Sequence, residues 1–84
     1  MRRKRKIHYH IVPNNDYWWV KGKDKPVPFD DPEFKGKSKS NTKYCHSMKR
    51  AMFLFKRCPI GAMLYRFVSC GKGYVLVMEW EKLK

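Results

Sequence analysis

Acidic residues are scarce in this chain. Asp and Glu number only 7 among 84 residues, whereas Lys and Arg number 20, so the formal net charge at pH 7 is +13. The excess is spread along the chain, because residues 1–42 hold 11 basic and 5 acidic side chains (+6) and residues 43–84 hold 9 and 2 (+7). So few acids exclude a charge-neutral enzyme surface and point to an anionic partner.

Long apolar runs are also missing. No segment approaches the roughly 20 apolar residues of a membrane span. The basic start is followed by residues 7–13, which hold no apolar block of the length that a signal peptide needs. The cysteines are three, Cys45, Cys58 and Cys70, an odd number that does not suit the paired framework of a secreted domain. We therefore expect reduced thiols and a cytoplasmic protein, in the host cytoplasm if the chain is phage-encoded.

The sequence also lacks motifs for catalysis and metal binding. It has no P-loop, no nucleophile motif and no Gly-x-Gly-x-x-Gly. No paired Cys-x-x-Cys or His-x3-His spacing occurs among the candidate ligands, which are His8, His10, Cys45, His46, Cys58 and Cys70. A small basic nuclease that pairs His8 or His10 with a lysine or tyrosine is an alternative, but the acids that could hold Mg²⁺ lie in turns and a loop at unspecific spacing. We predict a non-enzymatic protein with no metal, cofactor or small-molecule substrate.

The composition nevertheless supports a folded core. Hydrophobic residues are 43% of the chain and aromatic residues 15%, a content that disordered chains lack. A length of 84 residues suits one small domain. We therefore divide the chain into a basic arm, residues 1–6, and a single domain, residues 7–84, with a long loop at 22–41.

The first half of the domain predicts a β-hairpin. The alternation in residues 7–12 predicts two faces of a strand, with Ile7, Tyr9 and Ile11 on one and His8, His10 and Val12 on the other. Residues 13–16, Pro-Asn-Asn-Asp, favour a turn. Residues 17–21 resume as a strand rich in aromatic and branched side chains. Val27 and Phe29 could add a short third strand beside this hairpin.

The second half predicts a helix and a second hairpin. A helix over 43–57 is expected, with Thr42, or Asn41 or Ser40 beside it, as the N-cap and with Pro59 and Gly61 ending it. Its stripe at helical spacing is Tyr44, Cys45, Met48, Ala51, Met52 and Phe55. Residues 63–70 and 74–80 are expected to form strands joined by a glycine turn at 71–73. Along the last strand, the alternation predicts one face made of Tyr74, Leu76, Met78 and Trp80 and another made of Val75, Val77 and Glu79.

The order of these elements predicts the fold class. It is α+β, an antiparallel sheet of two β-hairpins with one helix packed on one face, in the order β-β-α-β-β. One helix that covers one face of such a sheet is the simplest way to bury both the apolar stripe of the helix and the apolar face of the sheet.

The opening motifs resemble those of a known family. His10-Ile11-Val12-Pro13 and then Trp18-Trp19-Val20 are similar to the opening of small bacterial and phage domains of unknown function, which begin with a His-x-Val-Pro strand followed by Trp-x-Val. Later segments look similar too, namely Thr42-Lys43, Ala51, Gly61-Ala62 and Gly71-Lys72-Gly73. The longer 22–41 loop, the basic arm and the cysteines depart from the family. The resemblance supports the fold and implies no activity.

Two groups of residues are candidates for contact with an anionic partner. The first is the arm, Arg2, Arg3, Lys4, Arg5 and Lys6, which suits phosphate backbones because each neutralised phosphate releases counterions. The second is the outer face of the predicted helix, Lys43, His46, Lys49, Arg50, Lys56 and Arg57. Phe53 is expected among these cations, and Leu54 is also expected off the core side. A Phe ringed by cations is typical of a stacking surface or an interface anchor, unless the loop or a second copy covers it.

Two other surfaces offer weaker alternatives. Rings on the strands could stack bases from a sheet face, and these are Tyr9, Tyr17, Trp19, Tyr65 and Phe67. Core packing explains most of them, and the glycine-aromatic signature of RNA-binding sheets is missing. A helix with Phe53, Leu54 and Phe55 could lie on a membrane surface, but its apolar stripe is needed against the sheet, so we predict no membrane partner.

The sequence thus leads to two predictions of function. The first is a non-enzymatic basic protein that binds nucleic acid, DNA or RNA, through phosphate contacts made by the arm and the helix face. The alternative is a small phage-encoded inhibitor or adaptor that docks on an acidic surface of a host protein, for example of the transcription or replication machinery. The acidic cluster of Asp30, Asp31 and Glu33 would be repelled by phosphate, so we expect it to face away from nucleic acid.

Overall fold

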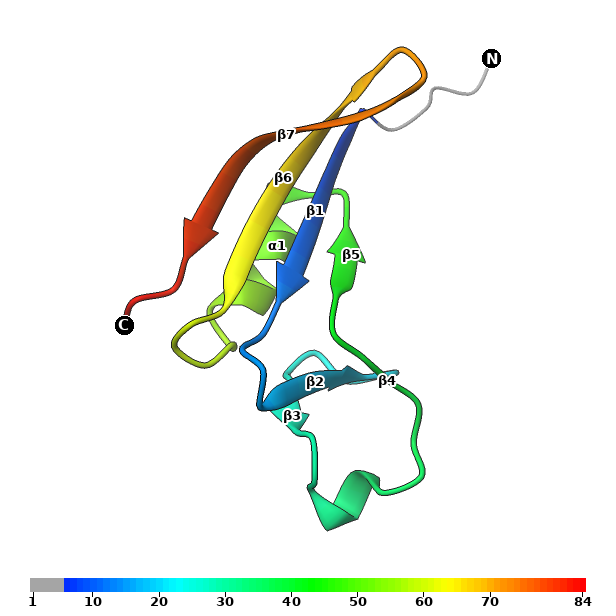
Figure 1. Cartoon of the computed structure of the whole chain (residues 1–84), viewed down its shortest axis with the longest axis vertical. Coiled ribbons are helices and arrows are strands. Elements are labelled where there is room, and N and C mark those ends of the chain that lie inside the picture. The colour runs from blue at the N-terminus through cyan, green and yellow to red at the C-terminus, as the bar shows by residue number, and fades with distance from the viewer. Residues whose placement is uncertain (1–5) are drawn as a thin grey trace.

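The main body of the protein is a four-stranded antiparallel sheet with one helix on one face (Figure 1). The computed structural model describes residues 6–84. The strands are β5 (Lys43–Cys45), β1 (Ile7–Val12), β6 (Met63–Cys70) and β7 (Gly73–Glu81), in that spatial order. Helix α1 (Met48–Phe55) packs across β1 and β6. The coarse prediction of an α+β fold with antiparallel strands and one helix is therefore confirmed.

The hydrophobic core lies between α1 and the facing side of β1 and β6. As the alternation predicted, Tyr9 and Ile11 point into it from β1, and His8 and His10 lie on the other side of the sheet. Leu64 completes the strand contribution and is fully buried. The core cluster consists of Tyr9, Ile11, Trp19, Ala51, Leu54, Cys58, Ala62 and Leu64.

A second, smaller sheet lies beyond the end of β1. In it β2 (Tyr17–Val20) pairs on one side with β3 (Val27–Pro28) and on the other with β4 (Lys39–Ser40). A 3-10 turn, η1 (Pro32–Phe34), lies between β3 and β4. The region predicted as a long loop therefore contains two short strands, and the short strand expected beside residues 17–21 is present. Trp19 ties this sheet to the core, because its indole N–H donates to the Ile11 carbonyl at 2.9 Å.

The predicted first hairpin is wrong. Both edges of β1 are occupied by β5 and β6, so β1 and β2 belong to different sheets. Pro13 is buried directly after β1 and has no N–H to continue a ladder. The chain therefore leaves the main sheet at this point. The strand that follows the turn, β2, pairs with β3 and β4 in the smaller sheet.

The predicted helix also starts too early. Lys43–Cys45 form β5 and pair with β1, and α1 begins only at Met48 after the N-cap Ser47, whose hydroxyl accepts from the Arg50 N–H. Its buried side is made by Ala51 and Leu54, whereas Met48 and Met52 are 38% and 37% exposed. The expectation that Leu54 lies off the core side is therefore wrong. The apolar spacing of residues 43–47 suits a helix, but residues 43–45 instead form hydrogen bonds with the edge of β1.

The second hairpin is confirmed, as β6 and β7. The register shifts between Arg66, which pairs with Met78, and Phe67, which pairs with Leu76, so Val77 is left as a bulge. Leu76 therefore lies on the face of the sheet without the helix, whereas Met78 and Trp80 lie on the helix side. The prediction that all of Tyr74, Leu76, Met78 and Trp80 share one face is wrong. β7 is an edge strand whose apolar run Tyr74–Met78 stays 42–53% exposed, because α1 does not reach it.

Candidate nucleic-acid interface

The outer side of α1 gathers positive charge on a segment that itself contains no acid. Residues 43–57 contain no Asp or Glu, and Lys49, Arg50, Lys56 and Arg57 are all exposed. They share this side because Ala51 and Leu54 turn the opposite side to the sheet. Among residues 6–84, Lys49, Lys56 and Arg57 form no ion pair with a carboxylate. Their charges are therefore directed to solvent.

Phe53 lies between two of these cations, as the sequence predicted. The Arg57 guanidinium carbon is 3.7 Å from the centroid of the Phe53 ring, and that of Arg50 is 5.2 Å away. Arg57 also donates to the Phe53 carbonyl at 3.0 Å, which fixes its side chain over the ring. Phe53 itself is 38% exposed and is not covered by residues 22–41. A guanidinium held over an aromatic ring keeps its remaining N–H groups free for an anion.

A single carboxylate organises the start of this surface. Asp24 accepts from Arg50 at 2.7 Å and lies 3.9 Å from the Lys43 ammonium. Lys43 lies on β5, not on the helix as predicted, and its ammonium is 5.4 Å from the Trp19 ring centroid and donates to the Lys23 carbonyl. Lys43 thus connects the two sheets and does not belong to the outer face of α1.

The end of α1 holds a cation that the sequence analysis missed. The Lys82 ammonium donates to the carbonyls of Lys56 and Cys58, both at 2.7 Å. These are carbonyls at the negative end of the helix, where a cation is favourable. No local pattern links Lys82 to α1, because 26 residues separate it from Lys56 and the contact depends on where β7 ends.

The arm falls mostly outside the described residues. Arg2, Arg3, Lys4 and Arg5 belong to that part, and the structure describes only Lys6, which is exposed. The Lys6 carbonyl accepts from the Ser69 N–H at 2.7 Å, so Lys6 lies beside the end of β6. The predicted role of the arm stays a prediction.

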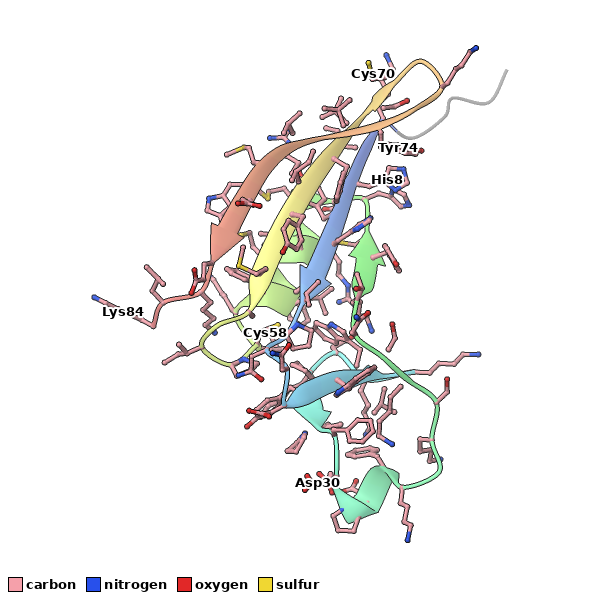
Figure 2. All side chains as sticks on the ribbon, viewed as in Figure 1. His8, Asp30, Cys58, Cys70, Tyr74 and Lys84 are labelled. Carbon is pink, nitrogen blue, oxygen red and sulfur yellow. The ribbon has the colours of Figure 1, made fainter. Side chains whose placement is uncertain are left out.

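The strand aromatics separate into buried and exposed groups. Tyr9 and Trp19 are each only 3% exposed and belong to the core. Tyr65 and Phe67 lie on the helix-free face of the main sheet, where the centroids of their rings are 6.5 Å apart. His46, predicted on the helix, follows β5 instead, and its ring contacts that of His8 with centroids 4.4 Å apart. Figure 2 shows His8 close to Tyr74 near the β6–β7 turn.

The histidines and cysteines of this structure do not form a metal centre. Within residues 6–84 no three His, Cys, Asp or Glu side chains come together as a possible metal site. Burial, and then the neighbouring His46, lowers the pKa of His8, and burial together with His8 lowers the pKa of His10. All three thiols are free, and burial raises the pKa of the Cys58 thiol to about 11. In the described part of the chain, no helix has the length and apolar character to cross a bilayer.

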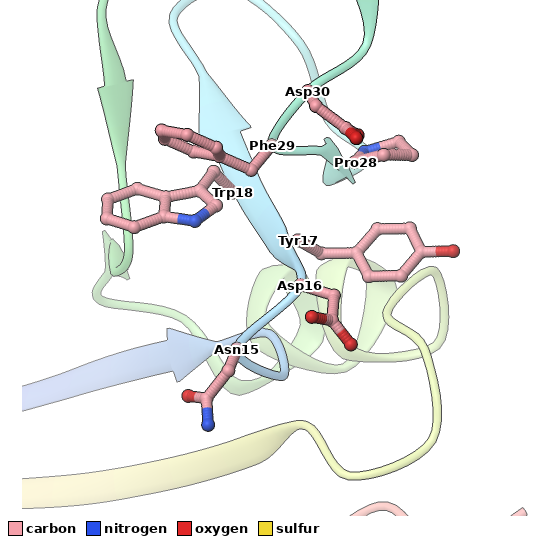
Figure 3. A pocket seen from close by; sticks show the side chains of 7 residues that line it. All are labelled: Asn15, Asp16, Tyr17, Trp18, Pro28, Phe29 and Asp30. Atoms are coloured by element: carbon pink, nitrogen blue, oxygen red, sulfur yellow. The ribbon is translucent and has the colours of Figure 1, made fainter.

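The small sheet carries a hollow of different character (Figure 3). It has a volume of about 690 Å³ and is lined by Tyr17, Trp18 and Phe29 together with the carboxylates of Asp16 and Asp30. The Trp18 and Phe29 rings pack with centroids 5.2 Å apart. Two carboxylates at its wall make this hollow unsuitable for a polyanion.

Comparison with protein-family models, with curated proteins and with solved structures found no match for this chain. The resemblance of His10–Pro13 and Trp18–Val20 to the small bacterial and phage domains stays a hypothesis. The candidate interface therefore depends on its own chemistry, which is a short acid-free helix that presents four cations around one exposed ring.

Proposed function

We propose that this chain is a non-enzymatic nucleic-acid-binding protein whose helix α1 contacts the phosphate backbone. The observation that carries the proposal is Phe53, exposed on an acid-free helix and flanked by Arg57 and Arg50. Phosphates accept the remaining guanidinium N–H groups, and Lys49 and Lys56 extend the contact along the helix. The arm, residues 1–6, would add further phosphate contacts.

Most of the binding free energy in such a contact comes from counterion release. For a duplex, the logarithm of the binding constant falls with the logarithm of salt concentration, with a slope of roughly −0.9 per neutralised phosphate. Four contacts by α1 alone would weaken binding about 150-fold between roughly 50 and 200 mM salt. A larger loss is expected if the arm contributes.

A matched pair of charge-reversal variants tests where the contact lies. Lys49→Glu with Lys56→Glu changes the helix face, and Lys21→Glu with Lys35→Glu changes two exposed lysines of the small-sheet region. Each pair lowers the net charge from +13 by 4, to +9. We expect the helix pair to weaken duplex binding and to make the salt slope about 1.8 less negative, which is two phosphate contacts. Equal losses from the two pairs would show that only the overall charge matters and would overturn the proposal.

The alternative function is an inhibitor or adaptor that docks on an acidic protein surface. It is favoured by Met48 and Met52, which expose apolar surface on the same helix as Phe53 and would suit the desolvated centre of a protein interface. Pull-down from a nuclease-treated lysate separates the two proposals. A stoichiometric protein that stays bound through Phe53 favours the adaptor, and loss of every partner favours nucleic acid.

A further inference from the structure

The helix-free face of the main sheet carries a continuous array of rings. The strand register places Tyr44, His10 and Tyr65 side by side in one row across β5, β1 and β6. In the next row, His8 lies opposite Phe67, and His46 packs against His8 from the end of β5. Six neighbouring positions therefore hold only aromatic or imidazole rings. We call this set the ring platform: Tyr44, His10, Tyr65, His46, His8 and Phe67.

The rings of the platform support one another. His10 lies between Tyr44 and Phe67, with centroids 4.5 Å from each. His8 contacts Tyr74 at the end of the platform, with centroids 4.2 Å apart. The helix packs on the other face of the sheet (Figure 1), and Tyr44 and Tyr74 are 63% and 53% exposed at the two edges of the platform. Tyr44 and His46 are thus exposed, whereas the four inner rings are half-buried between their neighbours.

The charges around the platform select its occupant. No platform position is Lys, Arg, Asp or Glu. Lys6 and Lys72 lie at the end where β1 begins and β6 turns into β7. Glu79 lies opposite Tyr65 toward the other end. A surface of rings bordered by cations at one end suits bases on the rings and phosphates beside the cations.

Single-stranded nucleic acid meets these requirements and a duplex does not. Bases in a duplex are stacked on one another, so their faces are not available to a ring surface. The outer face of α1 lies on the opposite side of the sheet, so the platform is a separate surface from the phosphate contact described above. The segment His46–Ser47 connects the two surfaces around the β5 edge.

We propose that the ring platform binds single-stranded nucleic acid by base stacking on Tyr44 and its neighbouring rings. This inference deepens the proposed function and rests on it for the class of partner. It adds that the nucleic acid is single-stranded, because the cations of α1 alone do not distinguish a single strand from a duplex.

The test compares single-stranded and duplex binding of the full chain by fluorescence anisotropy at one salt concentration. The probes are an oligothymidylate of about 12 nucleotides, within the site sizes of single-strand binders, and a duplex of the same length. Tyr44→Ala removes an exposed ring whose loss leaves the core intact. Phe29→Ala is the matched control, because Phe29 is a 56% exposed ring in the small-sheet region.

We expect wild type to prefer the single strand. Tyr44→Ala should weaken single-strand binding by about 5- to 150-fold, with little change for the duplex, and Phe29→Ala should change neither. Phe67→Leu gives a second reading, because it removes a platform ring and keeps an apolar side chain on β6. Equal single-strand affinity in wild type and both platform variants would overturn the inference. So would a dimer in sedimentation experiments that Tyr44→Ala dissociates, because a second copy would then occupy the platform.

The same experiments separate this inference from the proposed function. If the helix variants bind normally and Tyr44→Ala loses the single strand, the contact by α1 fails and the platform stands. If the helix variants lose both probes equally and Tyr44→Ala loses neither, the platform fails and the contact by α1 stands.

Discussion

Replacement of Leu54 by Ala tests the orientation of α1, on which the proposed phosphate contact depends. Leu54 is 0% exposed and packs in the core cluster, whereas its neighbour Phe53 is 38% exposed on the outer side. Truncation of a fully buried Leu costs about 2.7–5.0 kcal/mol through lost burial and the cavity left behind. Loss of the exposed Phe53 ring, with its Arg57 contact, should cost only about 0.5–1 kcal/mol.

These magnitudes are large against the stability of so small a domain. At about 0.05–0.15 kcal/mol per residue, 84 residues give roughly 4–13 kcal/mol in total. Leu54→Ala should therefore remove a large fraction of the free energy of unfolding. Where it leaves too little folded protein to measure, Leu54→Met keeps most of the volume and should cost less than about 1.5 kcal/mol.

Urea unfolding followed by tryptophan fluorescence measures the difference, because Trp19 belongs to the core and Trp80 packs against it. With a slope of roughly 1 kcal/mol per molar urea, Leu54→Ala should lower the midpoint by about 3 M or more, and Phe53→Ala by less than about 1 M. A larger loss for Phe53→Ala than for Leu54→Ala would refute the orientation of α1, and the proposed phosphate contact with it.

Three further predictions concern other parts of the structure. Trp19→Phe removes the donor to the Ile11 carbonyl and should cost about 1–3 kcal/mol in urea unfolding, whereas an unchanged midpoint would mean that the small sheet is not tied to the core by this bond. Because the pKa values of His8 and His10 are lowered in the folded state, the unfolded chain binds protons more readily, so the melting temperature should fall as pH drops below about 6.5. His8→Phe combined with His10→Phe should flatten that dependence, and an identical slope would contradict it. The Cys58 thiol, with a pKa raised to about 11, should react with iodoacetamide at pH 8 far more slowly than the exposed Cys70, and equal rates by mass spectrometry would argue against its burial.

Local patterns predicted individual elements well. The alternation in residues 7–12 correctly placed Tyr9 and Ile11 on one face, which is the core side, and the glycine turn correctly joined two long strands. Phe53 was also correctly placed among cations. Each of these conclusions depends only on side chains that are close in sequence, where periods of 2 and 3.6 residues carry the information.

Pairing between distant segments was not predictable in the same way. Residues 43–45 fit a helix by spacing, but they pair with the edge of β1, and 32 residues separate the partners Ile11 and Lys43. The ring platform was missed for the same reason, because it forms only when β5, β1 and β6 come together. The bulge at Val77 reverses the faces of β7 and depends on the twist of the whole hairpin.

The exposed outer edge of β7 has a practical consequence for concentrated samples. Its backbone groups and the apolar run Tyr74–Met78 form a template onto which the same strand of another molecule can hydrogen-bond. Mutual repulsion between molecules that each carry +13 opposes such growth. Salt near 1 M shortens the reach of that repulsion to about 3 Å. A high-salt wash therefore favours aggregation, and purification at moderate ionic strength should yield the more monodisperse protein.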